Sequence, residues 1–174
     1  MRFHFSIALV AGGALLVGCS QDRLSAPADH RLVPPSLASV PNTSCQHVSG
    51  SFVFTSFQFT SSTSAVGAGN VSGDITGTFS AQYFDLHQNG DGSSVMNARH
   101  TISTSAGSIT TADVIILRPD QNPAIARPNS RVEVTGGTSA YAGATGQLHT
   151  HGEVNLATLE GSIDFKGEVC LPTR

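Results

Sequence analysis

The sequence has no tryptophan, only two tyrosines and little charge, since Asp, Glu, Lys and Arg make up 12% of its 174 residues. Glu and Lys, which favour helices, are scarce, whereas Ser, Thr and Gly are abundant. This composition is typical of short strands joined by tight turns. The sequence also lacks a cluster of basic residues, which argues against nucleic acid as a partner. Its length supports about one domain.

No apolar run is long enough to cross a bilayer as a helix. The first residues, MRFHFSIALVAGGALLVGCSQD, contain an apolar stretch at residues 5–18 that only Ser6 interrupts, as in a secretory signal peptide. Its end, Leu-Val-Gly-Cys, resembles the bacterial lipobox, in which cleavage before the cysteine leaves a diacylglycerol on its sulfur. We therefore expect a signal peptide at residues 1–18 and lipidation of Cys19. The alternative is that Cys19 is part of a discarded signal.

Ser20 follows the lipobox cysteine, and in the lipoprotein pattern this favours the outer membrane. We therefore expect an exported protein that its amino-terminal lipid anchors in the bacterial cell envelope. Residues 20–44 hold four of the eight prolines and show no sustained hydrophobic period. Such a segment cannot bury enough apolar surface to order itself. We expect residues 19–44 to form a lipidated tether and residues 45–174 to form the folded domain.

Cysteines are few: apart from Cys19, the sequence contains only Cys45 and Cys170. In an oxidising compartment an isolated pair of this kind predicts a disulfide. The bond would bring the two ends of the folded domain side by side. A metal-binding or nucleophilic pair is the alternative, but no ligand residues lie near either cysteine in the sequence.

The folded region shows a hydrophobic period of two. Residues 159–169 (LEGSIDFKGEV) and 73–83 (GDITGTFSAQY) alternate as half-buried antiparallel strands do. In residues 51–59 the parity of the phenylalanines changes, which predicts a β-bulge. Turn signals at 89–92, 106–108 and 118–130 separate the strands. We predict an all-β domain, namely a small closed antiparallel barrel of about eight strands, with a two-sheet β-sandwich as the alternative.

One segment, VTGGTSAYAGATGQL at residues 134–148, is rich in glycine. Its spacing does not fit a dinucleotide-binding loop, and Gly143 is followed by Ala rather than by the Lys of a Walker-type loop. We interpret the segment as a wide strand-to-strand connection. The first two glycines would permit a corner with positive φ, the tyrosine would close the barrel end, and the last two would allow close backbone approach. These residues are Gly136, Gly137, Tyr141, Gly143 and Gly146.

The same segment resembles the GGTGxFxGAxG sequence of the allene oxide cyclase and dirigent barrel superfamily, and of similar secreted bacterial barrels. The resemblance covers about residues 71–170, with a hairpin-like stretch before the segment and a closing strand after it. It implies an eight-stranded barrel with a mostly apolar cavity, and relatives that act on or steer hydrophobic small molecules. The amino-terminal polar motif of the plant cyclases and the Asp and Arg pattern of dirigent proteins have no counterpart here. The resemblance therefore carries over no catalytic residue.

Two histidines, His149 and His151, lie on one strand face, at a spacing that can chelate a metal, and Glu153 continues that face. Leu148 and Val154 lie on the opposite face of the same strand, and their apolar side chains predict that this face is in the core. We therefore expect the histidines to be solvated. We predict no metal site, because the sequence offers no third ligand that we can place.

Inward polar residues are the remaining candidates for chemistry. His100 is in register with Met96 and Ile102 on the apolar face of its strand. A core histidine bonded to a backbone carbonyl is the simpler interpretation, because an acid–base role needs a partner. Tyr83 is a second polar side chain on an inward face.

Three functions fit these features. The leading one is a non-catalytic, lipid-anchored envelope barrel that binds an apolar small molecule or an envelope partner and needs no cofactor. The resemblance suggests an isomerase or cyclase with a hydrophobic substrate, and a structural envelope protein is the third. A cavity that holds His100 and Tyr83 close together would favour an enzyme, an open apolar pocket would favour binding, and a filled core would favour a structural role.

Overall fold

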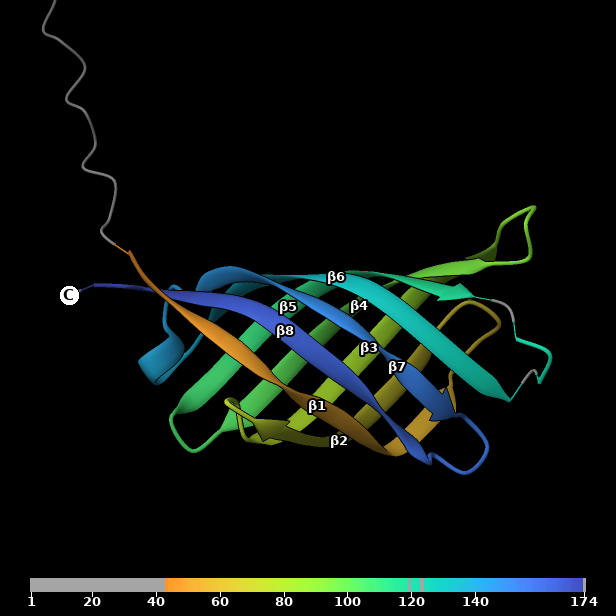
Figure 1. Cartoon of the computed structure of the whole chain (residues 1–174), viewed down its shortest axis with the longest axis horizontal. Helices are drawn as coiled ribbons and strands as arrows, with labels where there is room; N and C mark the ends of the chain where they lie inside the picture. The colour runs from red at the N-terminus through yellow and green to blue at the C-terminus, as the bar shows by residue number, and fades with distance from the viewer. Residues whose placement is uncertain (1–42, 119, 123, 174) are drawn as a thin grey trace, which may run out of the picture. The chain divides into compact units, whose positions relative to one another are not determined.

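A computed structural model describes residues 43–118, 120–122 and 124–173, and in this part of the chain all regular structure apart from one short 3₁₀ helix is β-strand. The eight strands form a closed antiparallel barrel in chain order (Figure 1). The prediction of a closed barrel is confirmed. The elements are β1 (Thr43–Phe59), β2 (Ala65–Gly73), β3 (Gly77–Gln88), β4 (Ser94–Thr104), β5 (Gly107–Arg118), β6 (Ile125–Gly137), η1 (Ser139–Tyr141), β7 (Thr145–Asn155) and β8 (Gly161–Pro172). The predictions for residues 1–42, including lipidation of Cys19, fall outside the described residues.

Strand β1 closes the barrel because it pairs with two neighbours. Its first part pairs with β8, from Thr43 opposite Pro172 to Phe52 opposite Ile163. Its second part, from Gly50 onward, pairs with β2. Closure leaves no unpaired strand edge in the sheet, which removes a template for aggregation.

A disulfide joins Cys45 on β1 to Cys170 on β8, as the sequence predicts. The two residues lie directly opposite each other in the β1–β8 register. The bond therefore links the first strand of the barrel to the last. It lies at the end of the barrel where the described chain begins and ends (Figure 1).

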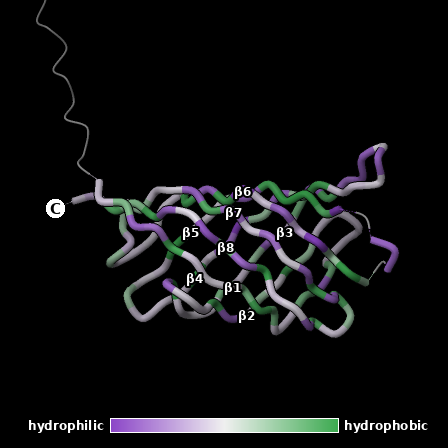
Figure 2. The backbone as a smooth tube through the Cα atoms, viewed as in Figure 1, coloured by the Kyte–Doolittle hydropathy of each residue, from purple (hydrophilic) through white to green (hydrophobic). Residues whose placement is uncertain are grey.

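The alternating pattern places one face of every strand in the core. Hydrophobic and hydrophilic residues alternate along the strands (Figure 2), and the buried set includes Phe79, Ile102, Leu148 and Phe165. The predicted bulge in β1 is confirmed, because the β1–β2 register shifts between Phe54 and Ser56. The shift lets phenylalanines on both sides of the bulge line the interior.

The glycine-rich segment is a connection between β6 and β7, with η1 in its middle, as interpreted from the sequence. Gly136 and Gly143 have positive φ angles of 152° and 73°. Gly137 does not, and its role is instead close approach, because a Cβ there would collide with the carbonyl oxygen of Ser108. Tyr141 is half-buried and packs against the core at this end of the barrel.

The turn expected over residues 118–130 is shorter than predicted, because β6 begins at Ile125. Pro128 lies inside β6 and is buried. Proline has no N–H to donate. The β6–β7 pairing is accordingly interrupted between Ala126 and Asn129, while pairing with β5 continues on the other side.

Candidate functional site

A cavity of about 90 Å³ lies inside the barrel. It extends from His100 in the middle of β4 to the end of the barrel that bears the β1–β2, β3–β4, β5–β6 and β7–β8 connections. Phe59, whose side chain is 56% exposed, lines it at that end. The cavity therefore opens there, at the end opposite the disulfide (Figure 1).

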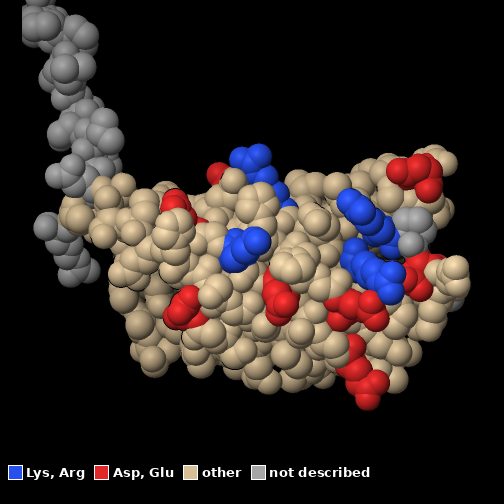
Figure 3. Space-filling model, in the orientation of Figure 1, with Lys and Arg blue, Asp and Glu red and all other residues tan. Residues whose placement is uncertain are grey.

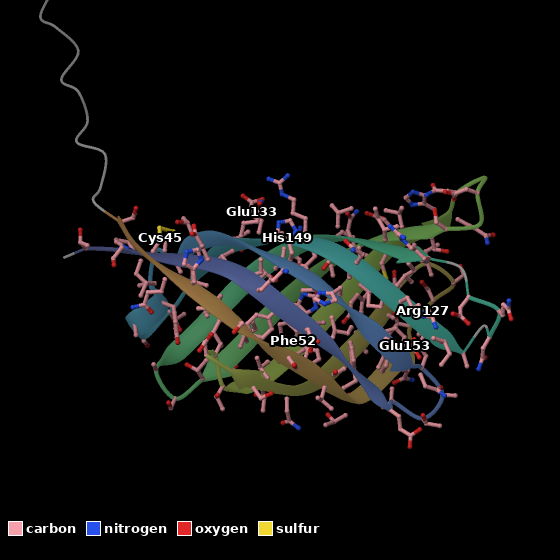
Figure 4. The ribbon with its side chains drawn as sticks, in the orientation of Figure 1. Cys45, Phe52, Arg127, Glu133, His149 and Glu153 are labelled. Atoms are coloured by element: carbon pink, nitrogen blue, oxygen red, sulfur yellow. A yellow bond between two sulfur atoms is a disulfide. The ribbon has the colours of Figure 1, made fainter. Side chains whose placement is uncertain are left out.

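Aromatic rings form most of the cavity wall on the β1–β3 side. Phe79 makes edge-to-face contacts with Phe52 and Phe54, at ring-centroid distances of 5.3 and 5.2 Å. Phe57 packs on Tyr83 at 5.5 Å. Phe52, labelled in Figure 4, comes from the strand that closes the barrel. Such contacts make a rigid apolar surface.

His100 and Asp113 are in contact in the middle of the barrel. Nδ1 of His100 lies 3.2 Å from Oδ2 of Asp113, and the two side chains are 13% and 3% exposed. Thr111 completes the group, because its hydroxyl donates a hydrogen bond to Oδ1 of Asp113 at 3.0 Å. His100 therefore bonds a carboxylate rather than the backbone carbonyl of the simpler interpretation.

Tyr83 lies next to this group. Its ring packs edge-on against the imidazole of His100 at a centroid distance of 5.8 Å. Burial, and then the negative charge of Asp113, raise the pKa of the Tyr83 hydroxyl well above its usual value. Among the described residues no fully buried side-chain N or O atom lacks a hydrogen-bond partner, so this hydroxyl is not an orphaned buried group, and Tyr83 lines the cavity. The cavity thus holds a neutral phenol beside a histidine–aspartate pair.

A second polar pair lines the same cavity from the other side. Ser130 on β6 and Thr150 on β7 are both buried, and their hydroxyls are hydrogen-bonded to each other. One of the two hydroxyls donates to the other, so each has a hydrogen-bond partner while the accepting hydroxyl keeps its own proton to donate. Among the lining residues, only Tyr83, His100 and Asp113 are ionisable.

Charged side chains lie on the outer surface of the barrel, near the end where the cavity opens. Arg127 on β6 bonds Glu153 on β7 at 2.8 Å and Asp120 in the β5–β6 connection at 2.8 Å. Figure 4 shows Arg127 and Glu153 side by side near this end. The contacts attach the connection to the barrel, although ion pairs of an exposed side chain of this kind contribute little to stability.

His149 and His151 lie on the outer face of β7 and are exposed, as expected. His149 lies between Arg131 and Lys166 in the register of β6, β7 and β8. These two positive side chains would repel a metal ion bound to the histidine. Charged residues are sparse and mixed in sign on the face that Figure 3 shows. Within the described ranges, the one cluster with metal-ligand types is Cys45, Glu168 and Cys170, and its two sulfurs form the disulfide.

Asp113 is the site residue that sequence reasoning missed. The signal was present, because Ile109, Thr111, Asp113 and Ile115 alternate with outward residues along one strand. A carboxylate at an inward position of an apolar strand requires a buried partner. That requirement pairs Asp113 with His100 on the neighbouring strand of the same hairpin.

Comparison of the chain with protein-family models, with curated proteins and with solved structures finds no match. Over the residues that the structure describes, no helix has the length and apolar character needed to cross a membrane. The argument for function therefore depends on the cavity itself.

Proposed function

We propose that the barrel is a binding module for a neutral, mostly apolar small molecule, which enters the cavity through the mouth. The observation that carries the proposal is the lining, in which aromatic and aliphatic side chains surround a few convergent polar groups. This combination is typical of small-molecule sites. A filled structural core would leave no such space.

The ligand is expected to be uncharged. No Lys or Arg lines the cavity, and the one acid, Asp113, is already paired with the one histidine. A carboxylate ligand would lose its hydration without gaining a free cation, which is costly in an apolar site. Fatty acids are therefore poor candidates, whereas ketones, alcohols and similar apolar molecules fit the lining.

The enclosed space limits the buried part of the ligand. An apolar cavity of about 150 Å³ holds benzene, and this one is smaller, at about 90 Å³. We therefore expect a small polar head group near His100 and an apolar tail that extends past Phe59 into the mouth. Phe59 is 56% exposed, and its ring makes one edge-to-face contact, with Phe57, that would have to change as the tail passes.

Two probes of similar length test this proposal on the full chain. 2-Heptanone carries a neutral head group, and heptanoate carries an anionic one. We expect saturation-transfer NMR to detect binding of 2-heptanone but not of heptanoate. Ala126→Phe, which adds a ring to the cavity lining, should abolish binding. Asn129→Phe adds the same ring to an exposed position of the same strand and should preserve binding. Equal binding by both variants, or none by the unmodified chain, would overturn the proposal.

We also propose that the module is a lipid-anchored envelope protein, with Cys19 as the lipidation site. The lipobox-like sequence before Cys19 supports this. The position of the mouth is compatible, because β1 begins at the opposite end of the barrel (Figure 1). Cys19→Ala should prevent incorporation of labelled fatty acid and release the protein from the membrane fraction. Continued labelling of the variant would contradict the anchor.

Membership of the allene oxide cyclase and dirigent superfamily remains a proposal with two supports. One is the eight-stranded barrel, and the other is the glycine-rich connection between β6 and β7. A second candidate function, isomerisation of a hydrophobic substrate, is favoured by one specific observation. His100 and Tyr83 lie in contact on the cavity wall, with Asp113 behind the histidine.

A further inference from the structure

The geometry points to a catalytic activity in the same cavity: proton transfer at the carbon next to a carbonyl group, with His100 as the general base and Tyr83 as the hydrogen-bond donor to the carbonyl oxygen. This inference rests on the proposed function, since the substrate must first bind inside the barrel. It names the chemistry of that ligand, a neutral apolar carbonyl compound with an acidic α-C–H bond.

The hydrogen bonds around Asp113 determine which nitrogen of His100 is the base. The single proton of the Thr111 hydroxyl is donated to Oδ1 of Asp113. Thr111 Oγ1 also lies 3.4 Å from His100 Nδ1, but its proton is already used. The proton between His100 and Asp113 must therefore belong to Nδ1. In the neutral imidazole, the lone pair is then on Nε2.

Nε2 is the nitrogen available to a ligand. The contacts of the imidazole with Asp113 and Thr111 both involve Nδ1, and the His100 side chain keeps 13% exposure while lining the cavity. Asp113 stabilises the imidazolium that forms when Nε2 accepts a proton, because the carboxylate is already within ion-pair distance. Asp113 is a positioning residue, since it acts through His100.

Tyr83 supplies the complementary group. Tyr83 lines the cavity, and its ring is in contact with the imidazole. The raised pKa keeps the hydroxyl protonated at neutral pH, so it can donate a hydrogen bond to a carbonyl oxygen. A donor of this kind stabilises the negative charge that develops on the oxygen when the α-proton leaves.

The proposed step is balanced without a cofactor. Nε2 of His100 takes the α-proton, the C–H electron pair becomes the carbon–carbon π bond, and the carbonyl π electrons move to the oxygen that Tyr83 holds. The imidazolium then returns a proton to carbon. When the imidazolium has first exchanged its Nε2 proton with water that reaches it through the mouth, return to the same carbon exchanges hydrogen with solvent. Return to the far carbon of a conjugated enolate isomerises a double bond. No oxidant, reductant or metal is required.

Deuterium exchange into 2-heptanone in D₂O tests the inference on the full chain, with mass spectrometry to count deuterons at the α-carbons. We expect the protein to accelerate exchange and His100→Ala to lower the rate by about 10²–10⁴-fold, the usual contribution of a general base. Added imidazole should restore part of the rate to His100→Ala by occupying the space left by the ring. His149→Gln, at an exposed histidine outside the cavity, is the matched control and should exchange at the original rate.

Two further variants separate the roles. Tyr83→Phe keeps the ring contact but removes the donor, so it should slow exchange while binding persists. Asp113→Asn presents an amide N–H to Nδ1 and forces the proton onto Nε2. It should therefore lower kcat with little change in KM, whereas a purely structural defect would weaken binding as well.

The outcomes distinguish this inference from the binding proposal. Binding of 2-heptanone without accelerated exchange would overturn proton transfer and leave the binding module intact. No binding would overturn both. Accelerated exchange that His100→Ala leaves unchanged would show that another base acts, and would also contradict the inference.

Discussion

Asp113 is the one acidic residue among the buried side chains of the described residues. Its carboxylate lies within an otherwise apolar barrel, and each oxygen has one side-chain partner, His100 for Oδ2 and Thr111 for Oδ1. A buried charge without a partner is far more costly than a buried pair. The three side chains therefore stabilise the barrel only as a unit.

Replacement of one partner should thus cost more than replacement of both. We expect His100→Leu to lower the free energy of unfolding by about 3–5 kcal/mol, because it leaves Oδ2 of the buried Asp113 carboxylate without its partner. The double variant His100→Leu, Asp113→Leu should recover most of that loss. Urea denaturation of the wild type, both single variants and the double variant measures the coupling. Additive losses would contradict a coupled pair.

Tyr83 gives the stability of the fold a dependence on alkaline pH. Its pKa is raised in the folded state, so the unfolded chain loses this proton first, starting near the ordinary tyrosine value of about 10. Above that pH the free energy of unfolding should fall by about 1.4 kcal/mol per pH unit from this one group, until the folded protein also ionises. Denaturation of wild type and Tyr83→Phe at pH 9 and pH 11 tests this. The variant should lose less stability over that interval, and identical slopes would contradict the assignment.

At the scale of the element, β2 presents glycines to the interior, which leaves room for the aromatic side chains of β1 and β3. Gly67 and Gly69 face inward on β2, beside the rings of β1 and β3. A Cβ at Gly67 would lie 3.0 Å from the ring of Phe54 and 3.2 Å from that of Tyr83. A Cβ at Gly69 would lie 2.7 Å from the Phe79 ring and would collide with the backbone carbonyl of Val53.

These contacts predict a graded response to alanine. Gly69→Ala should destabilise the barrel by about 1–3 kcal/mol, the usual cost of overpacking, because the backbone of β1 cannot move away. Gly67→Ala should cost less, since flexible ring edges can shift by a few tenths of an ångström and alanine is intrinsically better in a strand. Gly90→Ala, where no atom lies within 4 Å, is the control. Equal urea midpoints for Gly67→Ala and Gly69→Ala would contradict this packing.

Local patterns were enough to predict most of the elements. The period of two, the β1 bulge and the glycine-rich connection all follow from short-range rules of backbone geometry. The start of β6 could not be predicted in this way, because a proline such as Pro128 normally marks a turn. In the structure Pro128 lies within β6, where it pairs with β5 and only the pairing with β7 is interrupted. His100 was identified as inward, but its partner was missed. Their pairing is a contact between two strands, which no single strand's pattern displays.

At the scale of the whole molecule, the two ends of the barrel differ. One end carries the disulfide, the first described residues and the η1 connection. The other carries the mouth of the cavity beside exposed Phe59, and Arg127 with its two carboxylate partners lies on the outer surface near this end. The end that is covalently joined is thus separated from the end where a ligand would enter. Stability and binding should therefore respond to different substitutions.

The disulfide tests this separation. It links residues 125 positions apart, so in the chain-entropy model it should contribute about 4–5 kcal/mol by restricting the unfolded chain. We expect the double variant Cys45→Ser, Cys170→Ser to unfold at lower urea concentration. It should still bind 2-heptanone when folded, because backbone pairing of β1 with β8 continues to Phe52, well beyond the lost bond. Reductant should lower the stability of the wild type but not that of the variant. If the folded variant loses ligand binding, the disulfide end and the mouth are coupled, and the separation of roles is wrong.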